Sequence, residues 1–280
     1  MAELVEKRTD GQVKIQVYPD GALGDAFEMQ NSVKLGTLEM VNLGCGVTAG
    51  STPEYNITTF YYVWKSPEHM RAFFESDICK AFDQKYLDTT GIRIIASNWE
   101  QGDRHTVAKR PIRGVEDLKG LKIRVPQLES FVAAWKAMGA NPTPMSFGEV
   151  YSALQQGVVD AIEVPLDWIY KAKFYEQAEY VILTGHLGYP NQVQINEKVF
   201  QKLSKENQEV LVEAALEAGE YASKLQREAT ADLRGTIEAE GITFIEVDRS
   251  EFAKKVYQIV PDFEEQWGKG LWDKVQAIPY

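Results

Sequence analysis

Residues 205 to 240 carry the longest uninterrupted helical pattern in this 280-residue chain. No proline interrupts it, Ser204 precedes it as an N-cap candidate, and Gly241 follows it. At about 1.5 Å per residue, one helix here would be roughly 54 Å long, longer than a single small lobe is wide. We therefore expect a continuous helix that crosses two lobes; two helices broken near Gly219 or Gly235 are the alternative. Apolar or small side chains recur every three or four positions along the segment, at Leu211, Ala214, Ala218, Tyr221, Leu225, Ala229, Leu233 and Ile237.

Predicted strands and helices alternate over the rest of the chain. Helix starts are indicated by Ser66 before Pro67 and by the capping-box spacing of Ser146 and Glu149. With 44% hydrophobic residues, the chain is long enough to form two cores. We predict an α/β architecture of two lobes, in which a ligand lies beyond the carboxyl ends of the strands. Strands are expected at residues 13–17, 40–43, 122–125, 181–183 and 242–245.

The charge balance excludes one large class of partners. Asp and Glu number 41 against 30 Lys and Arg, a formal net charge of −11, whereas nucleic-acid binding needs clustered basic residues. An anionic ligand must therefore be met by a local basic site. No run approaches the ~20 apolar residues of a membrane span. The first eight residues lack the uninterrupted apolar core of a signal peptide.

Two features could have indicated a cofactor or metal, and both are weak. Gly44-Cys45-Gly46-Val47-Thr48-Ala49 matches the G-x-G-x-x-A dinucleotide pattern, but residues 50–53 read as a loop instead of the helix that would hold a pyrophosphate. A nicotinamide- or flavin-dependent oxidoreductase using this loop is therefore only an alternative. Cys45 and Cys79 lack metal-ligand spacing and are expected to be buried free thiols, although a disulfide stays open.

Catalytic motifs are also missing from the sequence. There is no G-x-S-x-G elbow, and His69, His105 and His186 lie in different segments. We expect no enzyme activity, no cofactor and no metal.

Two arginines stand where a ligand could be bound. Arg104 follows residues 101–103, and Arg124 ends a predicted strand just before Pro126. The alternation of that strand puts Arg124 on the face opposite Leu121, Ile123 and Val125. A guanidinium there could bind a carboxylate through two parallel hydrogen bonds, which a lysine could not imitate. A structural ion pair is the alternative role.

The segment Gly120-Leu121-Lys122-Ile123-Arg124-Val125-Pro126 resembles the signature strand of a known family. The family is that of the extracytoplasmic solute receptors of tripartite ATP-independent periplasmic (TRAP) transporters. The resemblance spans nearly the whole chain and is most specific from residue 120 to 176. Matching segments also lie at residues 18–24, 139–145, 147–151, 153–160, 173–176 and 203–208.

The resemblance implies a two-lobed, periplasmic-binding-protein-like fold with a long lobe-spanning helix. We expect residues 1–101 plus 190–229 to form lobe I and residues 102–189 plus 230–280 to form lobe II, with the helix at about 205–240 shared. The implied function is to bind a small organic carboxylate between the lobes and deliver it to the membrane subunits of a TRAP-type secondary transporter. The implied location is the periplasm, and no nucleic acid is involved. A receptor of an ATP-driven importer would share this logic but not these motifs.

The resemblance also implies which residues meet the ligand. Arg124 would form the salt bridge to its carboxylate and Arg104 would be a second arginine of the pocket. Phe147 would pack against the ligand, while Gln127 and Asn191 hold positions that often line the cleft. Glu163 and Val164 complete the expected set. The aromatic residues Phe60, Tyr61, Tyr62 and Trp64 are assigned either to cleft walls or to a lobe core.

Two departures from the family pattern limit what can be transferred. Many relatives have an asparagine that bonds the ligand at the position of Val164, so one polar contact is missing and the identity of the carboxylate stays open. Relatives also have an export signal, a first strand and the start of the first helix ahead of the segment that matches residues 2–5. Either the sequence is incomplete, or the first lobe lacks a strand and is expected to be less stable for it.

Overall fold

The computed structural model describes residues 1–19 and 21–280 of the chain. Its strands are β1 (Met40–Gly44), β2 (Ile92–Glu100), β3 (Arg104–Ala108), β4 (Lys122–Val125), β5 (Asn141–Pro144), β6 (Ala161–Pro165), β7 (Tyr180–Leu187), β8 (Pro190–Asn196) and β9 (Thr243–Ile245). Its α-helices are α1 (Ala2–Arg8), α2 (Ala26–Leu35), α3 (Pro67–Glu75), α4 (Asp77–Thr90), α5 (Glu129–Ala137), α6 (Val150–Gln155), α7 (Leu166–Lys171), α8 (Glu197–Lys202), α9 (Lys205–Ala239), α10 (Arg249–Tyr257), α11 (Val260–Trp267) and α12 (Leu271–Gln276).

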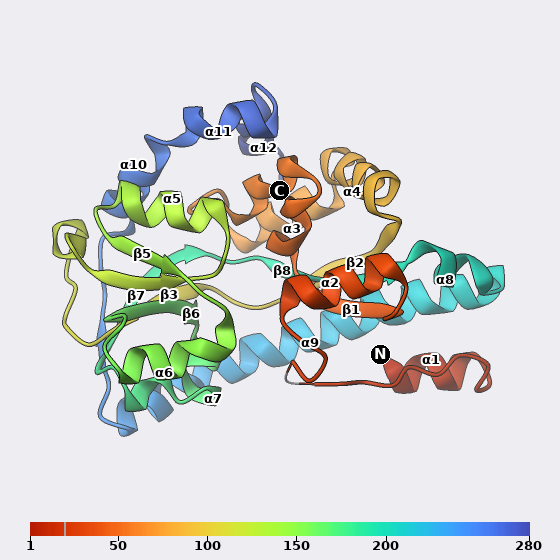
Figure 1. Cartoon of the computed structure of the whole chain (residues 1–280), viewed down its shortest axis with the longest axis horizontal. Helices are drawn as coiled ribbons and strands as arrows, with labels where there is room; N and C mark the ends of the chain where they lie inside the picture. Colours follow the sequence, from red (N-terminus) through yellow and green to blue (C-terminus); the bar gives the residue numbers. More distant parts are fainter. Residues whose placement is uncertain (20) are drawn as a thin grey trace.

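The strands form two separate sheets (Figure 1). One is antiparallel with the order β1-β8-β2, and the other is mixed with the order β5-β4-β6-β3-β7-β9. In the second sheet β4 runs parallel to both β5 and β6, so the carboxyl end of β4 lies between two like-oriented strands. The α/β prediction is confirmed, as are the strands predicted at residues 40–43, 122–125, 181–183 and 242–245.

The strand predicted at residues 13–17 is wrong. Its alternation is preserved, since Val13 and Ile15 are half-buried against the core of the three-stranded sheet while Lys14 and Gln16 are exposed. No strand in the described part of the chain is hydrogen-bonded to it, however. Alternation shows which side chains turn inward, but a strand also needs a neighbour to pair with.

Helix α9 is continuous over Lys205–Ala239, as predicted, and spans both sheets (Figure 1). The Ser204 hydroxyl caps it by accepting the Asn207 amide at 3.2 Å. Its first half packs Leu211 into the core of the three-stranded sheet, and its last turns pack Ile237 into a core of the six-stranded sheet. No helix among the described residues is both long and apolar enough to cross a bilayer.

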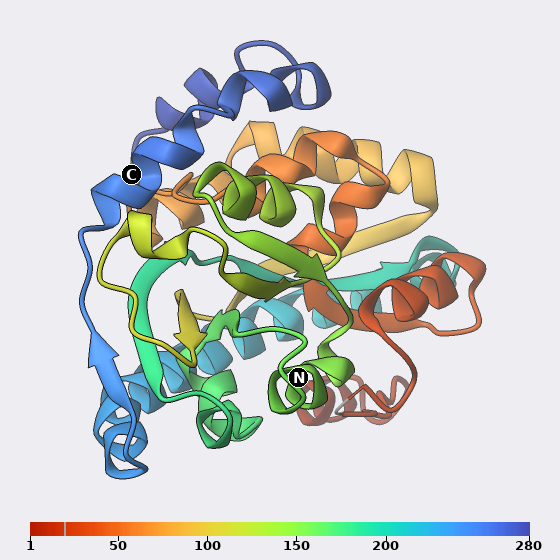
Figure 2. The ribbon, with the colours of Figure 1, turned by 60° about the vertical axis from the view of Figure 1, so that its left-hand side comes forward.

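Short connections carry the chain between the sheets. Residues 101–103 join β2 to β3, and Gly188 and Tyr189 join β7 to β8. After α9 the chain turns back through β9 and runs along one side of the molecule to α10, α11 and α12 (Figure 2). These last helices pack in one large core with α5 and the segment around residues 53–63. The two sheets are therefore linked by narrow segments, by α9 and by the C-terminal helices.

Both predicted helix starts are confirmed. The Ser66 hydroxyl accepts the His69 amide at 3.2 Å, with Pro67 in the first turn of α3. The capping box of Ser146 and Glu149 is present and opens a short 3-10 turn, Phe147–Glu149, that leads into α6. This turn fixes the backbone next to the arginine-bearing strand β4 through its parallel neighbour β5.

Candidate ligand-binding site

Arg124 is a buried cation whose charge no carboxylate of the described chain balances at salt-bridge distance. It lies on β4 with 3% of its surface exposed. Its Nε and Nη2 donate to the Met145 carbonyl at 3.1 and 2.6 Å, which holds the guanidinium against the end of β5. Burial lowers the pKa of Arg124 to about 10, Glu163 opposes the shift, and the charge of Arg104 adds to it. The group is still protonated at neutral pH, and a guanidinium carries more donors than one carbonyl can use.

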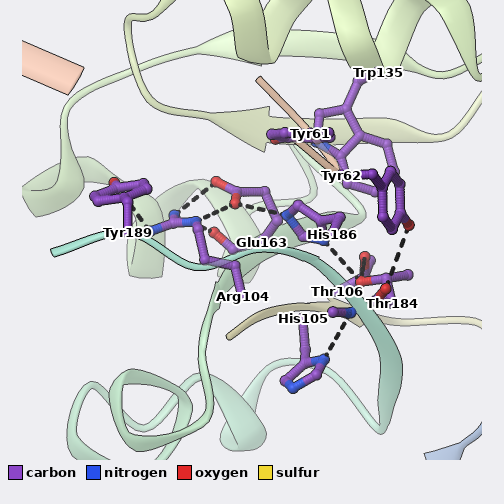
Figure 3. A network of polar contacts seen from close by, with 11 residues as sticks. Tyr61, Tyr62, Arg104, His105, Thr106, Trp135, Glu163, Thr184, His186 and Tyr189 are labelled. Carbon is purple, nitrogen blue, oxygen red and sulfur yellow. Dashed lines mark hydrogen bonds and ion pairs between the residues drawn. The ribbon is translucent and has the colours of Figure 1, made fainter. Parts of the chain in front are cut away.

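Arg104, in contrast, already has a carboxylate partner within the protein (Figure 3). Its Nε and Nη2 donate to the two Glu163 carboxylate oxygens at 2.5 and 2.8 Å, and Nη2 also reaches the Glu163 carbonyl at 2.8 Å. Burial, the largest single effect, lowers the pKa of Arg104, but the charge and hydrogen bonds of Glu163 together with the nearby Tyr189 and Tyr61 hydroxyls oppose it, and the pKa is raised. The aromatic rings of Phe131 and Tyr189 flank the guanidinium, with their centroids 5.4 and 5.8 Å from its carbon. Arg104 is thus a fixed, neutralised cation.

His186 holds the other side of the Glu163 carboxylate (Figure 3). Its Nε2 lies 3.2 Å from Glu163 Oε2, and its Nδ1 lies 2.9 Å from the Thr184 hydroxyl. Burial lowers the pKa of His186 although Glu163 opposes the shift. Burial, the largest effect on Glu163, raises its pKa, but Arg104 and His186 together oppose it and the pKa is lowered. A neutral imidazole beside a carboxylate must donate from Nε2 and accept at Nδ1. The chain Arg104–Glu163–His186–Thr184 therefore fixes the orientation of Arg104.

Strand alternation explains why Glu163 and Val164 have different roles. Neighbouring residues of a strand point to opposite faces of the sheet. Glu163 faces Arg104, whereas Val164 is fully buried in the core that also holds Val107 and Ile162. Glu163 therefore faces the polar cluster and Val164 faces a core, and the expectation that both line the ligand site stays a prediction.

The remaining predicted residues lie at different depths. Phe147 is 41% exposed and meets the rings of Trp168 and Phe174 at centroid distances of 4.8 and 5.8 Å. Gln127 is exposed just beyond β4. Asn191 lies on β8 beside Gly44 of β1, and its carbonyl oxygen accepts from the Gln101 amide. Arg104 and Glu163 lie close enough to Arg124 to shift its pKa. Phe147 lies on the exposed turn that follows Met145.

The sequence did not point to His186 or Tyr189 as members of this cluster. His186 is 23 positions from Glu163, and Tyr189 is 85 positions from Arg104. Only the pairing of β3 with both β6 and β7 brings them together. No local motif could have indicated contacts that depend on sheet order.

The family model described as bacterial extracellular solute-binding protein, family 7, matches residues 1–266. The chain belongs to this family. Among its relatives is the sialic acid-binding periplasmic protein SiaP of Vibrio cholerae, 32% identical over 278 residues, which are 99% of this chain and 86% of SiaP. This solute-binding protein is therefore a periplasmic receptor of the TRAP type.

Solved structures of family members share its fold. A TRAP periplasmic solute-binding protein from Ochrobacterium anthropi, with bound L-fuconate, matches with a TM-score of 0.93 at 31% identity, covering 99% of this chain and 91% of that one. One from Roseobacter denitrificans, with bound L-galactonate, has a TM-score of 0.86 at 34% identity, covering 95% and 91%. The predicted two-lobed fold with a long lobe-spanning helix is confirmed.

The Gly44 loop of this solute-binding protein does not have the form of a dinucleotide site. Strand β1 leads into a 3-10 helix, Cys45–Gly50, and no α-helix follows whose N-terminus could hold a pyrophosphate. The glycines instead permit close packing. A Cβ at Gly44 would lie 2.9 Å from the Tyr189 ring, and one at Gly46 would lie 2.8 Å from Leu128.

The two thiols are free and buried. Burial raises the pKa of Cys45 to about 12, so that thiol is unreactive at neutral pH. Within residues 1–19 and 21–280, no group of three His, Cys, Asp or Glu side chains is placed to hold a metal ion.

Proposed function

We propose that this receptor binds a small hydroxylated carboxylate of the sugar-acid type, with Arg124 as the anchor of its carboxylate. The observation that supports this most is the guanidinium of Arg124, which is buried, charged and without a carboxylate partner in the described chain. Leaving such a charge unpaired is costly, and a ligand carboxylate would pay that cost by forming two parallel charge-assisted hydrogen bonds. The relatives solved with L-fuconate and L-galactonate hold ligands of this chemical class.

The other residues have different proposed roles. Arg104 is held by Glu163, which His186 also contacts, and the Arg104 charge is already neutralised by Glu163. Arg104 would therefore position a second group of the ligand, other than its carboxylate. Phe147 would offer an apolar face, and Gln127 and Asn191 would bind hydroxyl groups. With Val164 apolar and buried, that position supplies no hydrogen bond.

The lobes and the absence of catalysis also belong to the proposal. Lobe I would comprise residues 1–101 plus 190–229 and lobe II residues 102–189 plus 230–280. The two sheets and the two ends of α9 support this division, whereas residues 53–63 share one core with α5 and the C-terminal helices. The chain would hold and release its ligand unchanged, and the membrane subunits of the transporter would move it.

Calorimetry with matched pairs of ligands tests the function. L-Fuconate, L-galactonate and N-acetylneuraminate would be titrated alongside L-fucitol and galactitol, which keep the hydroxyl groups of the first two acids but carry a CH2OH group in place of the carboxylate. We expect at least one acid to bind and the alcohols to bind at least about a hundredfold more weakly, since hydrogen bonds to charged groups contribute about 1.5–3 kcal/mol each. Equal binding of an acid and its alcohol would show that Arg124 does not anchor the ligand.

A further inference from the structure

A cavity lies along the connections between the two sheets. It has a volume of about 580 Å³, within the range of small-molecule sites. Its walls come from the connections at residues 101–103 and 187–189, from the start of α3, from residues 226–231 of α9 and from Arg249. Arg124, Phe147, Gln127 and Asn191 are not among its lining residues. We call this cavity the rear pocket.

The rear pocket has an anion-binding group in Arg249. Its Nε donates to the Leu183 carbonyl at 3.2 Å, and no carboxylate of the described residues lies at salt-bridge distance from it. A Cβ at Gly185 would overlap the guanidinium, so Arg249 lies flat on the backbone at a residue whose φ of +46° favours glycine. The side chain is thus held against the pocket wall, and within residues 1–19 and 21–280 its Nη1 and Nη2 make no hydrogen bond to the protein.

Among the other charges of the pocket, Asp103 lies near enough to Arg249 for the guanidinium to oppose the rise in the Asp103 pKa that desolvation causes, but the two form no salt bridge. Glu100 accepts from both Arg71 and Arg227 at 2.6 Å, so that acid is already shared between two bases. His105 and His186 are neutral, because burial lowers the pKa of both, that of His105 to about 3. Among the charged lining residues four are basic and three acidic, in a chain with a net charge of −11: Lys65, Arg71, Arg227 and Arg249 against Glu68, Glu100 and Asp103.

The uncharged walls indicate the body of the ligand. Trp64 and Met70 offer apolar surface, which suits a flat or compact carbon skeleton. Asp103 is exposed on the connection between β2 and β3 and could accept a hydrogen bond from a hydroxyl group. A ligand with an acid group at Arg249 and a hydroxyl group at Asp103 would be a small hydroxylated organic anion.

Two residues of the rear pocket also belong to the polar cluster on the other side of the connections. His186 and Tyr189 line the pocket, and they hold Glu163 and flank Arg104. The connection at residues 101–103 is tied to α9 as well, because the Gln226 amide donates to the Gln101 carbonyl at 3.0 Å and a Cβ at Gly102 would overlap it. A ligand in the rear pocket would therefore touch the same residues that position the acid site.

We propose that the rear pocket is a second binding site, for a small hydroxylated organic anion anchored at Arg249, and that filling it strengthens acid binding at Arg124. The expectation that the coupling is positive follows from the arrangement of the chain in this structure. The structure matches a relative solved with a bound sugar acid at a TM-score of 0.93, and a ligand that fits the pocket in this arrangement stabilises it. The coupling, though not the pocket itself, rests on the proposed function.

The test uses 3-fluoro-4-hydroxybenzoate as the probe and fluorine NMR of the whole chain as the readout. We expect binding in the wild type and in Arg124→Met, but a loss of at least about tenfold in affinity in Arg249→Met. Ala231→Trp, which fills the pocket from α9 and removes no charge, should also block the probe. Thermal melting of each variant confirms that it is folded. No binding of the probe, or binding lost in Arg124→Met and kept in Arg249→Met, would overturn the site.

The coupling is measured by repeating the probe titration with a saturating sugar acid. We expect the affinity for the probe to rise by roughly fivefold or more, and the affinity for the acid to rise by the same factor when the probe is saturating. An unchanged affinity would overturn the coupling. If no acid binds while the probe binds through Arg249, the proposed function fails and the rear pocket stands.

Discussion

Arg124 and Arg104 are both buried guanidiniums, but among the residues that the structure describes only Arg104 has a carboxylate at salt-bridge distance. We predict that Arg124→Lys weakens binding of the cognate acid by at least about tenfold and leaves the fold intact. Lysine keeps the charge but cannot hold the Met145 carbonyl and grip a carboxylate with two parallel bonds. Calorimetry gives the affinity, and circular dichroism with thermal melting shows whether the fold is kept. A loss of less than about 1 kcal/mol would be smaller than a hydrogen bond to a charged group and would count against the anchor.

Glu163 is the residue on which the neighbouring cluster depends. We predict that Glu163→Gln lowers the free energy of unfolding by about 3 kcal/mol, because it leaves the buried Arg104 charge without its partner. Glu197→Gln is the matched control, since Glu197 also holds an arginine, Arg93, through two bonds of 2.6 Å, but on a partly exposed surface. That variant should lose at most about 1 kcal/mol. Urea unfolding measures both, and equal losses would mean that burial does not set the worth of the Arg104 pair.

Asp83 gives the molecule a specific dependence on pH. Burial raises the pKa of Asp83 to about 6, with the Tyr55 hydroxyl bond opposing the shift. The folded pKa then lies above the unfolded value of about 3.9, so the stability that Asp83 contributes is complete below about pH 4 and is lost as the pH rises through 6. We predict that the difference in unfolding free energy between Asp83→Asn and the wild type shifts in favour of the variant by about 2 kcal/mol from pH 4 to pH 7.5. Urea unfolding across this pH range measures it, with Asp88→Asn, an exposed change on the same helix, as the control. A difference that stays constant with pH would contradict the prediction.

At this scale the sequence predicts the arginine but not its surroundings. The alternation of β4 correctly puts Arg124 opposite Leu121 and Ile123, because a period of two is a local property of a strand. From the sequence alone, neither Arg104 nor Arg124 could be assigned to a structural ion pair or to an anchor for a ligand carboxylate. It depends on Glu163, whose distance from Arg104 is set by the pairing of β3 with β6.

Among the elements, α9 shows how one residue type can have opposite effects in one helix. A Cβ at Gly219 would overlap Asn98 Oδ1 and lie 2.8 Å from the Trp99 ring, so β2 approaches the helix only because that position has no side chain. At Gly235 no atom of the described residues lies within 4 Å of such a Cβ. We predict that Gly219→Ala destabilises the fold by about 1–3 kcal/mol through overpacking. Gly235→Ala should stabilise it by about 0.5–1 kcal/mol, because alanine is the better helix former. Chemical denaturation measures the free energy of unfolding of both variants. If both were more stable than the wild type, β2 and α9 would not be in close contact at Gly219.

The same helix shows why elements are easier to predict than their partners. The absence of proline, the cap at Ser204 and the apolar period are all local, and they predicted α9 to within one residue of its observed end. Residues 13–17 have an equally good alternation and still form no strand, because pairing depends on a neighbour that the pattern does not specify. Local patterns settle the direction of side chains, and sheet order must come from the whole fold.

At the scale of the whole molecule, the connections between the sheets are where the two sheets would rotate relative to each other when a ligand binds. The connections at residues 101–103 and 188–189 are short, and Gly102 has a left-handed φ of +80°. His186 and Tyr189 belong both to the polar cluster around Arg104 and to the lining of the rear pocket. Hinges are usually a few residues at the ends of elements that absorb large backbone changes. Both proposed lobes would have to meet the ligand, since Arg124 belongs to the six-stranded sheet and Asn191 to the three-stranded one.

We therefore predict that a bound acid draws the lobes together. Small-angle X-ray scattering should give a smaller radius of gyration with a saturating sugar acid than without it, because contacts that only the closed form makes with the ligand stabilise closure. Arg124→Met with the same acid, and the wild type with the matching sugar alcohol, should keep the radius of the free protein. If the acid bound to the wild type and the radius of gyration did not change, the site would be rigid and formed before the ligand binds. In that case the connections at residues 101–103 and 188–189 would be fixed links, and affinity would depend only on the contacts at Arg124 and its neighbours.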